Sequence, residues 1–145
     1  MRSGGADPAA NRYVGVVARA GQSPIRVMVV DDTDHVRRML TTMLTVDGFD
    51  VVHQADSGDD ALAHVDDADP DVVVIDYKMP VMDGLTAARH LRSRRPDQVI
   101  VLYTAYIDDD LKREAEAAGV AICIDKIEGL SSLEREISRL CASLG

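Results

Sequence analysis

The segment DVVVIDYKMPVMDG, at residues 71–84, constrains the fold of this chain more than any other. It contains four consecutive aliphatic residues, Val72–Ile75, with no polar alternation, which is typical of a strand buried on both faces of a parallel sheet. The run ends at Asp76, and a loop containing Pro80 and closed by an Asp-Gly pair leads into a helical pattern. An acid at the carboxyl end of a central parallel strand lies at the crevice where such sheets bind ligands.

Four further apolar runs predict strands, at Ile25–Val30, Val51–Ala55, Val99–Tyr103 and Val120–Ile124. Apolar residues at helical spacing follow each strand and predict helices that begin near Asp34, Ser57, Leu85, Ile107 and Leu130. Asp34 is the expected N-cap of the first helix, and the apolar stripe of the last extends to Leu144. Five strands alternating with five helices over short connections predict an α/β fold: a parallel sheet between two layers of helices.

The chain has 145 residues, the size of one domain with its own core. Glycine and proline interrupt residues 1–24, which carry no recognised motif. We therefore expect a flexible N-terminal extension there, in which VGVVA at residues 14–18 forms at most a transient or partner-bound strand. The folded domain is predicted to span residues 25–145.

Composition and charge exclude several classes of protein. With 46% hydrophobic residues, 28% charged residues and a net charge of -9, the chain is expected to be globular and soluble. Direct DNA binding is disfavoured because phosphate contacts need a basic patch. No apolar run approaches the roughly 18 residues of a membrane span. Cys123 and Cys141 lie in apolar surroundings without paired spacing, so we expect two reduced thiols and a cytoplasmic location.

The histidines and one acidic segment carry weaker signals. The four histidines, at His35, His53, His64 and His90, lack a metal-ligand spacing, and we interpret them as solvated or packing residues. The acids at 108–110 are interpreted as a favourable first helical turn.

Five polar residues are expected to meet at one edge of the sheet, because each stands at the carboxyl end of a predicted strand. They are Asp31, Asp32, Asp76, Thr104 and Lys126. Three neighbouring carboxylates repel one another unless a cation lies between them, and oxygen ligands of this kind suit Mg²⁺. The lysine adds a mobile positive charge and the threonine a hydroxyl donor. Together they predict a site for an incoming phosphoryl group, with one carboxylate as acceptor.

With these strand ends and the string Asp76–Gly84, the sequence closely resembles the receiver domain of bacterial two-component response regulators. The resemblance covers Ile25 to about Leu144. It implies the flavodoxin-like strand order 2-1-3-4-5. Sheets of this kind bind ligands in the crevice outside the carboxyl ends of their strands. It also implies that Asp76 accepts a phosphoryl group from the phosphohistidine of a histidine kinase.

The resemblance further implies a role for each of the other site residues. Asp31 and Asp32 form the acidic pocket for Mg²⁺, and Asp76 and the backbone carbonyl of Lys78 complete the protein ligands. Thr104 and Lys126 are implied to contact the phosphoryl oxygens.

Two positions depart from the family pattern. The family usually has proline after the lysine, joined by a cis bond, and this chain has Ile127. A cis bond before a residue other than proline costs roughly 2.5–4 kcal/mol, so we expect either a trans bond with an altered loop or a strained site. Cys123 stands where the family usually has an aromatic switch residue, and Tyr103 or Tyr106 are the candidates to replace it.

The leading interpretation is a single-domain response regulator that signals through phosphorylation-dependent contact with another protein. Its expected partners are a histidine kinase or phosphotransfer protein and a downstream target. A homodimer through the fourth helix, the fifth strand and the fifth helix is a further option. The chain is not expected to be an enzyme, beyond catalysing its own phosphorylation and dephosphorylation on Asp76.

Three alternatives stay open at this point. One is a pseudo-receiver that binds its partner independently of phosphate. Another is a phosphatase of the haloacid-dehalogenase type, since Asp32-Thr33-Asp34-His35-Val36 fits the nucleophile pattern D-x-D-x-V. The third is that the chain is a fragment of a longer regulator.

Overall fold

The computed structural model describes residues 23–142. Within them, five strands form one parallel sheet in the order β2-β1-β3-β4-β5, which confirms the predicted order. The strands are β1 (Arg26–Val30), β2 (Asp50–Ala55), β3 (Val72–Ile75), β4 (Val99–Thr104) and β5 (Ile122–Asp125). The predicted extension at residues 1–24, apart from Ser23 and Pro24, lies outside the described residues, as does Leu144.

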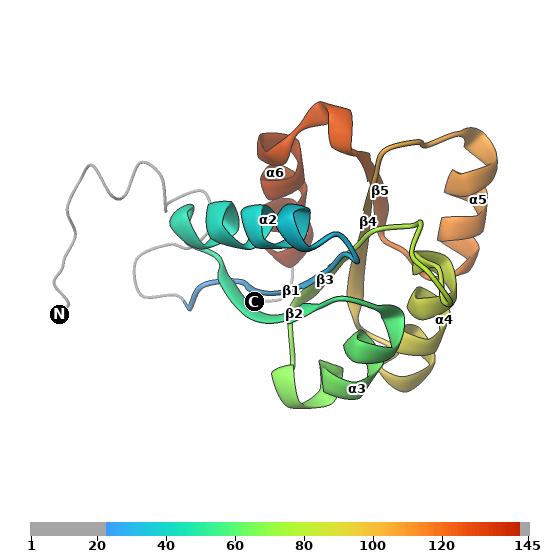
Figure 1. The fold of residues 1–145 in the computed structure, drawn as a ribbon, viewed down its shortest axis with the longest axis horizontal. Coiled ribbons are helices and arrows are strands. Elements are labelled where there is room, and N and C mark those ends of the chain that lie inside the picture. The colour runs from blue at the N-terminus through green and yellow to red at the C-terminus, as the bar shows by residue number, and fades with distance from the viewer. Residues whose placement is uncertain (1–22, 143–145) are drawn as a thin grey trace, which may run out of the picture.

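Helices cover both faces of the sheet. They are α2 (Asp34–Val46), α3 (Gly58–Ala68), α4 (Gly84–Arg94), α5 (Asp109–Ala117) and α6 (Leu130–Cys141), with a short 3-10 helix, η1 (Lys126–Glu128), after β5. Figure 1 shows α2 and α6 on one face and α3, α4 and α5 on the other. The predicted flavodoxin-like, three-layer α/β/α fold is therefore confirmed. Among residues 23–142, no helix has both the length and the apolar character that crossing a bilayer requires.

Alternate residues of the central strand serve two separate cores. Val73 and Ile75 belong to the cluster under α3, α4 and α5, whereas Val72 and Val74 belong to the cluster under α2 and α6. All four side chains are buried. Because both faces of β3 meet a helix layer, its sequence shows no polar alternation.

Polar side chains begin three of the helices. Ser57, Asp83 and Asp108 accept hydrogen bonds from backbone amides in the first turns of α3, α4 and α5, at 2.8–3.0 Å. These bonds satisfy amides that have no partner inside the helix. The expectation for α2 was wrong by one residue: Thr33 is the N-cap, its side chain makes no capping bond, and Asp34 lies in the first turn.

A carboxyl group lies in the seam between α2 and α6. Glu134 of α6 is hydrogen-bonded to Asp47, the C-cap residue of α2. Its second oxygen, Oε2, is buried without a hydrogen-bond partner among the described residues. Burial, together with the hydrogen bond and the negative charge of Asp47, raises the pKa of Glu134 from 4.5 to about 8. Glu134 therefore retains a proton near neutral pH.

Candidate functional site

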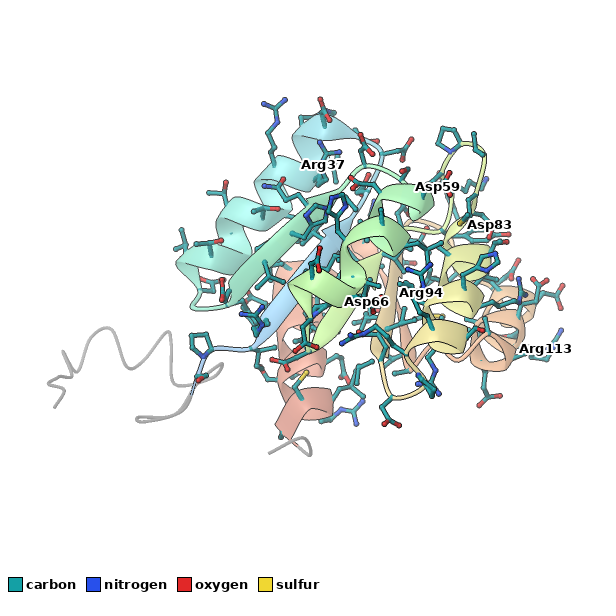
Figure 2. The ribbon with its side chains drawn as sticks, turned by 90° about the horizontal axis from the view of Figure 1, so that it is seen from below. Arg37, Asp59, Asp66, Asp83, Arg94 and Arg113 are labelled. Carbon is teal, nitrogen blue, oxygen red and sulfur yellow. The ribbon has the colours of Figure 1, made fainter. Side chains whose placement is uncertain are left out.

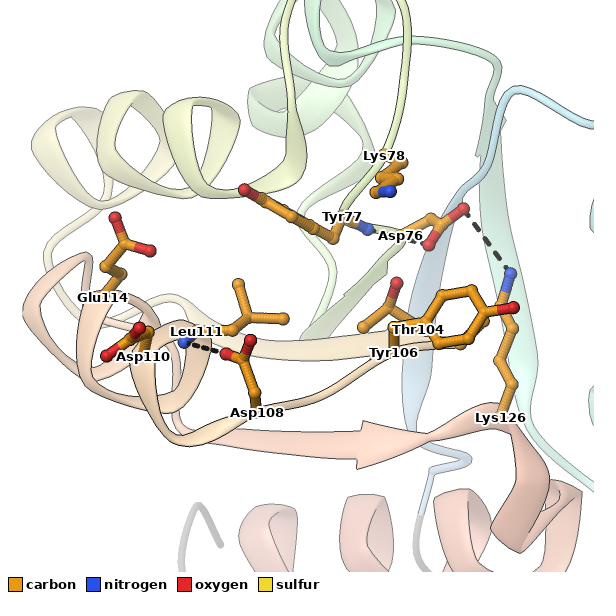
Figure 3. A pocket seen from close by; sticks show the side chains of 11 residues that line it. Asp76, Tyr77, Lys78, Thr104, Tyr106, Asp108, Asp110, Leu111, Glu114 and Lys126 are labelled. Carbon is orange, nitrogen blue, oxygen red and sulfur yellow. Dashed lines mark hydrogen bonds and ion pairs between the residues drawn. The ribbon is translucent and has the colours of Figure 1, made fainter.

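The carboxyl edge of the sheet brings the predicted site residues together. Asp31 follows β1, Asp76 follows β3, Thr104 ends β4 and Lys126 begins η1 after β5. Because β1 and β3 are neighbours, their terminal carboxylates lie side by side. Figure 3 shows Thr104 and Lys126 beside Asp76 at the mouth of a pocket.

Lys126 bridges two of the acids. Its Nζ atom lies 3.2 Å from Oδ2 of Asp31 and 3.5 Å from Oδ2 of Asp76. The other oxygen of each carboxylate is held by the backbone: the amide of Thr33 donates to Asp31 at 2.9 Å, and the amide of Tyr77 donates to Asp76 at 2.8 Å. Both carboxylates are thus oriented before any ligand arrives.

The electrostatic environment of Asp76 is balanced between opposing influences. Burial raises the pKa of Asp76, the charge of Lys126 and a hydrogen bond from Thr104 oppose the rise, and the charge of Asp31 adds to it. Burial lowers the pKa of Lys126, but the charges of Asp76 and Asp31 outweigh burial and raise it overall. Asp76 is therefore a carboxylate whose ionised form an additional cation would stabilise.

The three acids fit a hard divalent cation. Oxygens of Asp31, Asp32 and Asp76 all lie within 4.8 Å of one another. Asp31 is 3% exposed, whereas Asp32 is exposed to solvent. A set of carboxylate oxygens open to water on one side suits Mg²⁺, which keeps several waters when bound. Lys126 offsets part of the negative charge of the three carboxylates, and a bound cation would offset more, which fits the expectation of Mg²⁺ at this site.

Lys78 lies in the loop after β3 and lines the pocket next to Asp76 (Figure 3). Its backbone carbonyl as a metal ligand stays a prediction. The loop is kept close to the strand end by Gly84, whose amide donates to the carbonyl of Tyr77 at 2.7 Å. A Cβ atom at Gly84 would overlap the carbonyl oxygen of Asp76 and lie 3.0 Å from the Cα atom of Tyr77. Only glycine fits this approach of helix α4 to the site.

The pocket has an acidic wall that the sequence interpretation missed. Its volume is about 360 Å³, and Asp108, Asp110 and Glu114 from the start of α5 line it opposite Asp76. The acids at 108–110 do begin a helix as expected, with Asp108 as its N-cap. The spacing of four between Asp110 and Glu114, which places both on one side of a helix, was the available signal.

The loop after Lys126 takes the first of the two expected forms. No cis peptide bond occurs in the described residues, so the bond to Ile127 is trans. The chain turns into η1, and the amide of Ile127 donates to Oδ1 of Asp125 at 2.9 Å. Proline, which has no amide hydrogen, could not make this bond.

The candidate switch residues occupy three different environments. Cys123 is half-buried against the core under α3, α4 and α5, and Tyr103 packs against the core under α2 and α6. The Nζ atom of Lys126 lies 6.0 Å from the ring centre of Tyr103. Tyr106 is exposed and lines the pocket (Figure 3). Cys123 and Cys141 are both free thiols, as expected, and burial raises the pKa of each, that of Cys141 to about 11.

Two of the histidines, which the sequence interpretation treated as solvated or packing residues, lie together in the structure. His53 and His64 stack with ring centres 4.2 Å apart, and both contact Asp60.

The sheet order and the acids and lysine at its carboxyl edge define a flavodoxin-like α/β protein with an acidic pocket at the strand ends. The sequence model of the response regulator receiver domain family matches residues 27–138. The chain belongs to the response regulator receiver domain family. Receiver domains are signalling modules of two-component systems and not enzymes, so the phosphatase alternative with Asp32 as nucleophile is not supported.

Curated relatives support the same assignment. The response regulator GacA of Pseudomonas viridiflava is 42% identical over 114 residues, which are 78% of this chain and 53% of that protein. The transcriptional regulatory protein PdtaR of Mycobacterium tuberculosis is 34% identical over 110 residues, or 76% of this chain and 53% of that protein. The chain thus spans about half the length of these relatives.

Solved structures share the fold. The receiver domain of the putative response regulator NarL of Mycobacterium tuberculosis has a TM-score of 0.75 at 28% identity, covering 84% of this chain and 98% of that one. A chain of the CheX-CheY-BeF3-Mg complex of Borrelia burgdorferi has a TM-score of 0.78 at 23% identity, covering 88% of this chain and 98% of that one. The second likeness concerns the fold alone.

Proposed function

We propose that this chain is a phosphorylation-switched receiver in which Asp76 accepts a phosphoryl group from a histidine kinase or phosphotransfer protein. The observation that carries the proposal is the position of Asp76. Its carboxylate lies at the mouth of a pocket, in contact with Lys126 and beside two further acids, and burial raises its pKa. Such a group is oriented as a nucleophile and has room for a phosphoryl group in front of it.

In the proposed reaction, an oxygen of Asp76 attacks the phosphorus of a phosphohistidine whose other ring nitrogen carries a proton. The bond between phosphorus and the donor imidazole breaks, and that proton lets the imidazole leave as a neutral group. Mg²⁺ held by Asp31, Asp32, Asp76 and the carbonyl of Lys78 would neutralise charge on the transferred oxygens. Lys126, which now bridges two carboxylates, moves one contact to a phosphoryl oxygen. Thr104, whose hydroxyl now bonds Asp76, donates to a second one.

The output we propose is contact with another protein. A net charge of -9 disfavours direct DNA binding by this chain. The exposed side chains of Tyr106 and Ile127 flank the pocket residues Thr104 and Lys126, so a change at the phosphoryl group is transmitted to surface that a partner can touch. The single-domain organisation, the domain limits at 25–145, the cytoplasmic location and a homodimer through α5, β5 and α6 stay predictions.

Phosphorylation itself is tested by incubating the chain with Mg²⁺ and acetyl phosphate or phosphoramidate and locating the added mass. The expected result is one phosphoryl group on Asp76, and none in Asp76→Asn, because an amide is nearly isosteric with a carboxylate but a poor nucleophile. Asp110→Asn is a matched control, since Asp110 lines the same pocket on its far wall, and it should still carry one phosphoryl group on Asp76.

Two results would contradict the proposal. Label on Asp32 in the parent, lost in Asp32→Asn, would revive the phosphatase chemistry. No label from either donor or from a phosphorylated histidine kinase would favour the pseudo-receiver, for which Cys123 at the switch position and Ile127 after Lys126 are the supporting departures.

A further inference from the structure

A second group of side chains that could bind a metal ion lies between β2 and α3, outside the acidic pocket. Nε2 of His53, on β2, lies 3.2 Å from Oδ1 of Asp60, and Nδ1 of His64 lies 2.7 Å from the same oxygen. Asp60 and His64 belong to α3, the helix on which Figure 2 labels Asp59 and Asp66. One ligand atom from each of the three residues lies within 4.8 Å of the others.

An irregularity in the sheet directs His53 toward α3. The pairing of β1 with β2 shifts between Val27 and Met28, so that Val27 pairs with Val51 but Met28 pairs with His53. Val51 packs with the core under α2 and α6, whereas Met28 belongs to the core under α3, α4 and α5. A shift of one residue reverses which face a strand side chain points to, so His53 faces α3.

The helix supplies the other two groups. Asp60 and His64 are four residues apart, so their side chains lie on one side of α3. The second oxygen of Asp60, Oδ2, accepts a hydrogen bond from the amide of Asp56 at 3.2 Å. This bond leaves Oδ1 directed at the two imidazoles, and such support of a carboxylate is typical of metal ligands.

We propose that His53, Asp60 and His64 form a binding site for a late first-row divalent cation such as Zn²⁺. Ligand atoms about 2.1 Å from a tetrahedral Zn²⁺ lie about 3.4 Å apart. The separation of 3.2 Å between His53 and Asp60 fits this geometry, and the separation of 2.7 Å between His64 and Asp60 requires the exposed imidazole to move outward by a fraction of an ångström. For Nδ1 of His64 to bind the ion, it must give up its contact with the backbone carbonyl of Asp60 at 2.9 Å, and its ring must tilt out of the stack with His53. His64 is half exposed, so it has room to make this movement, and water completes the coordination.

The donor set separates this site from the acidic pocket. Imidazole nitrogens favour Zn²⁺, Cu²⁺ and Ni²⁺ over Mg²⁺, whereas the pocket at Asp76 offers carboxylate oxygens that favour Mg²⁺. The chain therefore has two cation sites of different chemistry. A cation at the histidine site joins β2 to α3 and stabilises the folded state through linkage.

Calorimetric titration with Zn²⁺ in excess Mg²⁺, which occupies the acidic pocket, tests the proposal. The expected result is one Zn²⁺ per chain, with affinity at least tenfold lower in His53→Gln and in His64→Gln. His90→Gln is the matched control, because His90 lies on α4 outside the cluster, and it should bind like the parent. Unfolding temperatures without metal establish that each variant folds.

Imidazole resonances provide a measurement that needs no variant. Zn²⁺ should shift the signals of His53 and His64 and leave those of His35 and His90 unchanged, and a Co²⁺-loaded sample should lack the charge-transfer bands of a cysteine ligand. Zn²⁺ affinity that is the same in the His53→Gln, His64→Gln double variant as in the parent would overturn the site, and so would unshifted resonances. The cluster would then be a hydrogen-bonded histidine pair on one carboxylate.

Discussion

Replacing Glu134 by glutamine should stabilise the folded chain above mildly acidic pH. The pKa of Glu134 is about 8 in the folded state and near 4.5 in the unfolded chain. Between these two values the folded state retains a proton that the unfolded state releases, so the free energy of unfolding falls as pH rises through this window. Glutamine removes this penalty and keeps a donor for the carboxylate of Asp47.

The size of the effect follows from the two pKa values. For a fully desolvated group, the difference corresponds to about 5 kcal/mol above the higher pKa. Glu134 is only partly buried, and solvent screening reduces such energies, so we expect a gain of about 1–2 kcal/mol at pH 8 and little gain near pH 4.5.

Urea unfolding of parent and variant across this pH range measures the difference directly. Glu136→Gln is the matched control on the same helix: Glu136 is paired with Arg139 at 2.6 Å, so its replacement removes an ion pair and should bring no gain in stability at pH 8. If the unfolding free energies of the parent and of Glu134→Gln ran parallel from pH 4.5 to 8, the reasoning would be refuted.

Three further predictions concern the pocket. Asp32→Ala should weaken Mg²⁺ binding by about tenfold or more. It should also raise the unfolding temperature of the metal-free protein, because it relieves repulsion among the acids; a lower unfolding temperature would show that the acids do not repel one another. The Lys78→Asn, Tyr106→Glu double variant should lose phosphoryl groups from Asp76 faster than the parent in Mg²⁺, because Lys78 and Tyr106 shield the site from water; equal decay rates would end this idea. Gly84→Ala should destabilise the fold by about 1–3 kcal/mol and slow phosphorylation, because its Cβ collides with the carbonyl of Asp76; an unchanged urea midpoint would mean that the loop adapts freely.

The order of elements could be predicted because β3 and its flanking loop carry unambiguous local signals. Val72–Ile75 has no polar face, and Asp76 marks the strand end. The strand order came from the family resemblance, since alternation of strands and helices is compatible with several orders. The placement of Asp34 at the N-cap was off by one because Thr33 precedes it and both types are common there.

Other features depend on tertiary contacts that no local pattern records. His53 meets α3 only because of the register shift beside Val27, and a shift of pairing leaves no signature in the sequence of β2. Likewise, Glu134 and Asp47 lie 87 positions apart in the sequence and meet only when α2 and α6 pack on the same face. The residue types after Lys126 left two forms of the loop open, a trans bond with an altered loop or a strained site. The hydrogen bond from the amide of Ile127 to Asp125 stabilises the first form.

The acidic wall of Asp108, Asp110 and Glu114 has a kinetic consequence for the choice of phosphodonor. At low ionic strength, a small anionic donor diffuses toward Asp76 against a repulsive field, whereas a donor protein with a basic surface around its phosphohistidine is attracted. Added salt shortens the range of this field, to about 10 Å at 0.1 M. Salt should therefore speed the encounter with the small anionic donor and slow the encounter with the donor protein. Discrimination between metabolite and kinase then begins in the diffusional approach, ahead of any contact with the reacting carboxylate.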